Sequence, residues 1–69
     1  MKMSLQEGRL IRDTRKKLGI NQVDLAQQIG LSHQPINQVE NGFESISLLN
    51  LRKICDVIGL EVVIREKNG

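Results

Sequence analysis

The side chains best suited to specific chemistry gather between residues 32 and 41. They are a serine hydroxyl, the chain's one imidazole and several carboxamides, namely Ser32, His33, Gln34, Asn37, Gln38 and Asn41. A carboxamide carries both a donor and an acceptor, which suits recognition by paired hydrogen bonds. Elsewhere we find no Ser/His/acid or Cys/His arrangement, no glycine-rich phosphate loop and no carboxylate pair flanking a predicted cleft. The pattern predicts a binding protein and not an enzyme.

The elements that position this stretch must come from one very small domain. A chain of 69 residues buries only about 60% of its unfolded surface on folding, so its core needs reinforcement. Cys55 is the one cysteine and His33 the one histidine, so we expect no internal disulfide, no metal site and no cofactor. Oligomerisation is the reinforcement that remains. No leader pattern or membrane-length apolar run occurs, and we expect an untargeted cytoplasmic protein with no membrane partner.

The net charge of +2 is unevenly distributed along the chain. Residues 1–19 hold Lys2, Arg9, Arg12, Arg15, Lys16 and Lys17 against two acids, whereas residues 20–51 hold no lysine or arginine. A basic run is usually only a solvated helix face. The basic run becomes evidence for a binding surface only when a binding motif lies beside it.

Capping residues and glycines divide the chain into four predicted helices. Ser4 and Glu7 form the pattern of a capping box, and Gly19 ends this first helix. Gly8 is expected to weaken its first turns. Its apolar stripe is expected to hold Leu10, Ile11, Thr14 and Leu18. The other three helices are expected to be capped by Asn21, Ser32 and Ser47 and to end at Gly30, at Asn41-Gly42 and at Gly59.

The second and third predicted helices fit the spacing of a helix-turn-helix. Counted from Gln22, such a motif needs apolar residues at the fourth, eighth, tenth, fifteenth and eighteenth places, a small residue at the fifth and glycine at the ninth. Those places hold Leu25, Ile29, Leu31, Ile36, Val39, Ala26 and Gly30. The small residue lets the helices cross closely, and glycine permits a left-handed turn. The sequence predicts that residues 22–41 form this motif.

The last segment changes from helical to strand periodicity. In the predicted fourth helix Cys55 lies on the apolar stripe, where we interpret it as a small core residue. After Gly59, apolar Leu60, Val62 and Ile64 alternate with Glu61, Val63 and Arg65. A lone strand is unstable in water, so its partner would be the same strand of a second copy. The alternative is a frayed, partly helical tail.

At these residues the chain resembles Cro and phage-repressor-type (XRE-like) helix-turn-helix proteins. NQVDLAQQIG followed by SHQPINQVENG is close to that family's pattern, and the resemblance covers roughly residues 5–59. The ending GLEVVIREK resembles that of HipB-like antitoxins, which carry a C-terminal dimerisation strand. The resemblance implies a mainly α fold: a four- to five-helix domain over residues 1–59 and a β-strand tail over residues 60–69 that pairs across a dimer.

The resemblance also implies a role for each exposed position. Base edges in the major groove would be read by His33, Gln34, Asn37 and Gln38; Gln34 and Gln38 suit adenine, and His33 suits guanine. DNA phosphates would be contacted by Asn21, Gln22, Ser32, Asn41, Lys16 and Lys17. Arg15 and Glu40 match a partly buried salt bridge that ties the first helix to the third, which is a structural role.

One departure from the family concerns affinity. Repressors of this type often carry lysine or arginine after the third helix, where this chain has Phe43-Glu44. Because neutralised phosphates supply most of the nonspecific affinity, one subunit should bind weakly and depend on its partner and on the basic first helix.

The function expected from the resemblance is sequence-specific binding of double-stranded DNA by a homodimeric transcriptional regulator. We expect a repressor that recognises a palindromic operator whose half-sites lie about 34 Å apart. The alternative is an antitoxin that binds a toxin protein and regulates its own operon. Only Lys67, Asn68 and Gly69 follow the predicted strand and its flanking Arg65-Glu66, which leaves little chain to cover a toxin.

Overall fold

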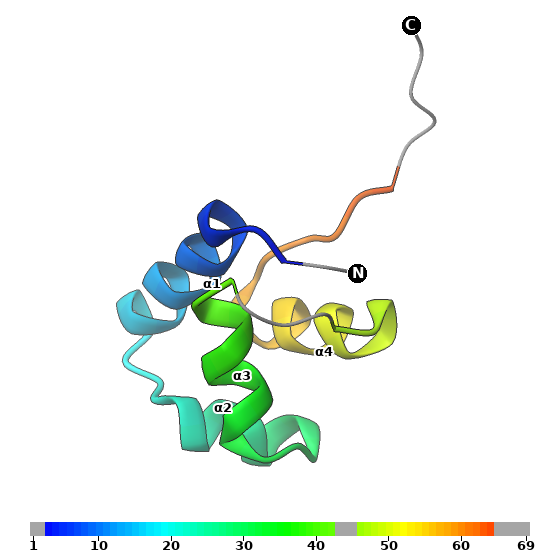
Figure 1. Cartoon of the computed structure of the whole chain (residues 1–69). Helices are drawn as coiled ribbons and strands as arrows, with labels where there is room; N and C mark the ends of the chain where they lie inside the picture. Colours follow the sequence, from blue (N-terminus) through cyan, green and yellow to red (C-terminus); the bar gives the residue numbers. More distant parts are fainter. Residues whose placement is uncertain (1–2, 43–45, 65–69) are drawn as a thin grey trace, which may run out of the picture.

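A computed structural model describes residues 3–42 and 46–64, which contain four α-helices. These are α1 (Leu5–Lys17), α2 (Gln22–Ile29), α3 (His33–Glu40) and α4 (Leu48–Ile58). Helix α3 packs on α1 and α2, and α4 packs on the same two helices (Figure 1). The predicted mainly helical fold is thereby confirmed. Within the described ranges, no helix has the length and apolar character needed to cross a membrane.

The helix starts follow the predicted capping residues. Ser4 and Glu7 form the full capping box, since the backbone N–H of each donates to the side chain of the other, at 3.1 and 3.2 Å. Asn21 Oδ1 accepts from the backbone N–H of Asp24 at 2.8 Å, and Ser47 Oγ accepts from that of Asn50 at 3.1 Å. Ser32 occupies the N-cap position of α3, but its side chain makes no capping hydrogen bond.

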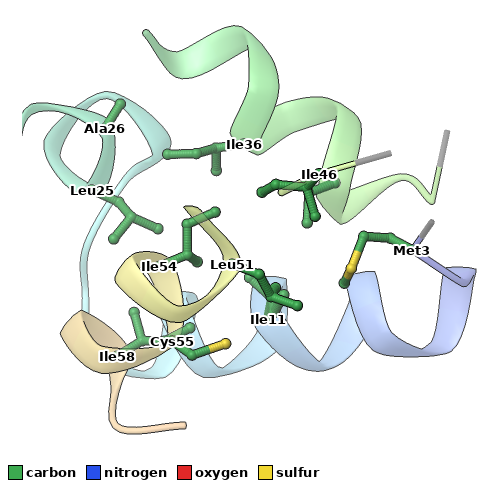
Figure 2. Packing of buried hydrophobic residues seen from close by; sticks show 11 residues of the cluster. Met3, Ile11, Leu25, Ala26, Ile36, Ile46, Leu51, Ile54, Cys55 and Ile58 are labelled. Carbon is green, nitrogen blue, oxygen red and sulfur yellow. The ribbon is translucent and has the colours of Figure 1, made fainter. Parts of the chain in front are cut away.

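The core is assembled from all four helices. Leu25, Ile36 and Ile54 come from three different helices and are fully buried, and Figure 2 shows them pointing toward one another. Cys55 belongs to this core, as predicted. Burial, with a smaller contribution from Asp56, raises the pKa of its thiol, which disfavours the reactive thiolate.

Helix α1 faces the core with a different stripe from the predicted one. Ile11 is buried, but Leu10 and Leu18 are 57% and 53% exposed. The inward stripe is Gly8, Ile11 and Arg15, spaced three and four residues apart. The prediction was wrong here because a glycine and an arginine, which are not apolar side chains, occupy two of the three inward places.

The segment after α4 contains no strand over residues 60–64. Leu60 and Val62 pack partly against the core of their own chain, while Val63 and Ile64 are 56% and 63% exposed. In Figure 1 this segment runs away from the helices. A strand needs a partner to form its hydrogen-bonded ladder, and no other described segment provides one. Phe43-Glu44 and residues 65–69 lie outside the described residues.

Candidate nucleic-acid interface

The polar residues predicted for recognition share one face of α3. His33, Gln34 and Asn37 are exposed and Gln38 is partly exposed. The opposite face of the same helix is buried through Ile36, Val39 and Glu40. A helix places residues three, four and seven apart on one side, so the polar and apolar sets separate cleanly. The core therefore holds α3 so that its carboxamides and imidazole point outward.

The turn between α2 and α3 fixes the direction in which α3 leaves. Gly30 ends α2 in the left-handed region, at φ 73°, which residues with a Cβ enter at a cost. The backbone N–H of Leu31 then donates to the carbonyl oxygen of Ala26 at 2.9 Å. Ala26 is buried on α2, which packs on α3, and its small side chain permits a close approach. Helices α2 (Gln22–Ile29) and α3 (His33–Glu40) and the turn between them form the predicted helix-turn-helix.

A buried ion pair ties α1 to the end of α3. Arg15 Nε and Nη2 donate to the two carboxylate oxygens of Glu40 at 2.7 and 2.9 Å, with the side chains only 8% and 2% exposed. Arg15 Nη1 donates to the carbonyl oxygen of Ile20 at 2.8 Å. The hydrogen bond with Glu40 raises the pKa of Arg15 despite burial, so its positive charge is secure. The structure thus brings this pair together as a structural tie.

A chain of carboxamides continues from this ion pair to the exposed face of α3. Gln22 Nε2 donates to Glu40 Oε1 at 3.1 Å, and Asn37 Nδ2 donates to Gln22 Oε1 at 3.3 Å. Asn41 Nδ2 donates to both the side-chain oxygen of Asn37, at 3.1 Å, and its backbone carbonyl, at 2.8 Å. Sequence reasoning missed the two links made by Gln22, which lies 18 positions from Glu40 and 15 from Asn37.

The other predicted contact residues lie in α1 and at the starts of α2 and α3. Lys16 and Lys17 are exposed in the last turn of α1, and a short connection leads from them to Asn21 at the start of α2. Ser32 is exposed where α3 begins, with its hydroxyl unused by the cap. Within the described residues, none of these side chains makes a hydrogen bond to Asn37 or Gln38. They are separate groups on α1 and at the starts of α2 and α3.

Comparison with known proteins agrees with this geometry. The sequence model of the helix-turn-helix family matches residues 11–64, which span most of the chain and include both helices of the motif. The chain belongs to the helix-turn-helix family. Helix-turn-helix proteins place the second helix of the motif in the DNA major groove, which here corresponds to α3. The helix that such proteins place in the major groove is therefore the helix that carries the exposed polar face in this chain.

Three similar proteins are regulators by description. An uncharacterised HTH-type transcriptional regulator of Methanothermobacter thermautotrophicus is 40% identical over 52 residues, which is 75% of each chain. The restriction-modification controller protein C.AhdI of Aeromonas hydrophila superposes with a TM-score of 0.76, at 30% identity over 83% of each chain. The clp gene regulator ClgR of Corynebacterium glutamicum gives 0.75, at 25% identity, over 90% of this chain and 82% of that one. This helix-turn-helix chain is thus similar to DNA-binding transcription regulators.

Proposed function

We propose that this protein binds double-stranded DNA sequence-specifically, as a dimeric transcriptional regulator that represses its target. The observation that carries the proposal is the division of α3 into a buried rear face and an exposed polar face that includes His33, Gln34 and Asn37. A helix of this kind fits the major groove, where the edges of the base pairs present distinct donor and acceptor patterns. The similarity to transcriptional regulators supports the same function.

Base reading is assigned to His33, Gln34, Asn37 and Gln38. A carboxamide can accept from N6 and donate to N7 of adenine at once, so Gln34, Asn37 and Gln38 suit A·T pairs. His33 suits guanine, to which an imidazole N–H donates at N7 or O6. We therefore expect a half-site that contains adenines and at least one guanine.

Phosphate contacts are assigned to Asn21, Gln22, Ser32, Asn41, Lys16 and Lys17. The first two lie at the start of α2, where unpaired backbone N–H groups and the helix dipole favour an anion. Exposed Lys16 and Lys17 follow one another in the last turn of α1, and they add the positive charge that α2 and α3 lack. Such contacts set the orientation of the protein without reading sequence.

Dimerisation is assigned to the tail, through Leu60, Val62 and Ile64. Val63 and Ile64 are exposed and apolar. A hollow of about 270 Å³ lies between the tail residues 60–63 and helix residues that include Leu10, Ile11, Leu51 and Cys55. Pairing of two such tails would cover these surfaces and would provide the strand partner that one chain lacks. Two copies related by a two-fold axis would present two α3 helices to a palindromic operator.

The test uses duplexes selected by the protein itself from a randomised library. Fluorescence anisotropy should then show that Gln34→Ala and Gln38→Ala each weaken binding to the selected duplex by roughly 1–3 kcal/mol, with less effect on a scrambled duplex. Gln28→Ala is the matched control, because Gln28 is an exposed glutamine of α2. Unchanged affinity and specificity in both α3 variants would refute the proposal.

The antitoxin alternative makes a different prediction for the tail. In that case exposed Val63 and Ile64 would contact a toxin protein, with DNA binding serving autoregulation. Co-purification with the product of the adjacent gene distinguishes the two functions, since a plain regulator would purify as a homodimer alone.

A further inference from the structure

Side-chain hydrogen bonds join Glu40, Gln22, Asn37 and Asn41 in a series. In every one of them the donor points toward the Glu40 end of the series. Starting from the buried carboxylate, each oxygen accepts from the N–H of the next side chain: Glu40 from Gln22, Gln22 from Asn37, and Asn37 from Asn41. The series runs from a side chain that is 2% exposed to two residues on the surface. We refer to Gln22, Asn37 and Asn41 as the amide relay.

Both ends of the amide relay are fixed by groups that can only accept. At the inner end, Glu40 is ion-paired with Arg15 and therefore offers Gln22 only carboxylate oxygens. At the outer end, Asn41 Nδ2 also donates to the backbone carbonyl of Asn37 at 2.8 Å, and a carbonyl cannot donate. Gln22 must therefore turn its oxygen toward Asn37, and Asn41 must turn its nitrogen toward Asn37.

Asn37 is consequently held in one of its two amide orientations. In the observed orientation its nitrogen meets the oxygen of Gln22 and its oxygen meets the nitrogen of Asn41. A rotation of 180° about the last side-chain bond would oppose oxygen to oxygen and nitrogen to nitrogen. Both hydrogen bonds would be lost and both new contacts would be repulsive.

We propose that Gln22 is a positioning residue that fixes the orientation of the Asn37 amide, and with it the order in which Asn37 presents a donor and an acceptor to DNA. Each group of Asn37 retains capacity beyond the relay, one N–H and one oxygen lone pair. These groups face outward in a fixed order, which suits one base in one register. The inference rests on the proposed function for its consequence in DNA reading, but the orientation itself is a property of the free protein.

The first experiment examines the side-chain amides of the free, full-length protein by ¹⁵N–¹H NMR. In the wild type, the Asn37 N–H that donates to Gln22 should resonate downfield and exchange slowly with water. Gln22→Met keeps an unbranched side chain but removes both polar groups, so the Asn37 signals should shift toward those of an exposed amide. Asn41→Ala removes the donor to the Asn37 side-chain oxygen, at the exposed end of the relay. It should also shift the signals of the Asn37 side-chain amide, without affecting the core.

Gln28→Met is the matched control, since Gln28 lies exposed on the same helix as Gln22 and its side chain makes no hydrogen bond within the described residues. It should leave the Asn37 signals unchanged. Circular dichroism of each variant verifies that it is folded. Asn37 signals that are the same in Gln22→Met, Asn41→Ala and the wild type would overturn the proposal.

The second experiment measures base preference with the duplex selected by the wild type. Gln22→Met should reduce discrimination at one base pair by roughly fivefold or more, and that base pair should be the one affected by Asn37→Ala. If Gln22 only binds phosphate, the variant would instead weaken all sequences equally and reduce the salt dependence; that result would overturn the positioning role. If the wild type selects no sequence, the proposed function fails, and the NMR experiment still tests the relay.

Discussion

Gly8 lies so close to Val39 that a Cβ atom on Gly8 would be 2.4 Å from the carbonyl oxygen of Val39. The same atom would be 2.7 Å from the carbonyl oxygen of Glu40. The backbone of helix α1 therefore lies directly against the backbone of the last turn of α3. This last turn also carries Glu40, the buried partner of Arg15. This contact, together with the ion pair, sets the position of α3 relative to the rest of the domain.

Gly8→Ala should destabilise the protein although alanine favours helix formation. The added methyl group meets backbone atoms, so α1 or α3 must shift, at a net cost of roughly 1–3 kcal/mol. Urea denaturation followed by circular dichroism measures the change. Gln6→Ala, at an exposed position of the same helix, should alter the free energy of unfolding by no more than about 0.5 kcal/mol. Equal stability of the two variants would contradict the close approach.

Arg15→Met should destabilise the fold by about 3–5 kcal/mol, because it leaves the Glu40 carboxylate buried with Gln22 as its remaining donor. The double variant Arg15→Met/Glu40→Leu should recover much of this loss, since no buried charge remains. Arg12→Met is the control: its pair with Asp13 spans 3.4 Å at the surface, and such pairs contribute about 0–1 kcal/mol. A similar loss in Arg12→Met and Arg15→Met would show that the buried pair has no special role.

The capping box of α1 should make stability depend on acid pH. Hydrogen bonds from the Ser4 side chain, and then from its backbone N–H, lower the pKa of Glu7 below its ordinary value of 4.5. A depressed pKa in the folded state stabilises the fold above pH 4.5, and this contribution is lost as the pH falls through the folded-state pKa. The stability difference between the wild type and Glu7→Gln should therefore be present at pH 7 and should shrink as the pH falls below 4.5.

Ser4→Ala provides the control for the acid dependence. It removes the hydroxyl group, so the same Glu7→Gln comparison in this background should give a smaller difference at pH 7. A difference that is unaffected by Ser4→Ala, or that grows as the pH falls, would contradict the assigned cause.

Ile64→Asp should prevent dimerisation if the tail pairs with a second copy. Ile64 is 63% exposed in the single chain, so the change should leave the monomer fold intact while placing a charge in the interface. Sedimentation velocity measures the oligomeric state. Leu49→Asp, a similarly exposed position at the opposite end of α4, should remain dimeric. A wild-type protein that sediments as a monomer at high concentration would refute pairing through the tail.

The sequence was sufficient to predict the four helices and the motif because their signals are local. Capping residues such as Asn21, the glycine at position 30 and the periodic apolar residues act within a few positions of one another. The exposed face of α3 follows from the same periodicity. These parts of the candidate site could therefore be placed without coordinates.

The contacts that hold α3 in place were less predictable because they depend on tertiary packing. Gly8 was interpreted as a weak point of α1, whereas it permits the close crossing over Val39. Gln22 was assigned only to phosphate, yet its amide bridges Glu40 and Asn37. Arg15 could be paired with Glu40 only through the family resemblance, since the two lie 25 residues apart. Strand periodicity in the tail likewise cannot reveal whether a partner strand is present.

The most direct measurement of the central claim is a ¹⁵N–¹H NMR titration of the full chain with its selected duplex. DNA binding through α3 predicts that the largest shifts occur at His33, Gln34, Asn37 and Gln38 and at the start of α2, with little change at exposed Arg52 and Lys53 of α4. Shifts centred on α4 and the tail, with the side-chain amides of α3 unchanged, would contradict the account.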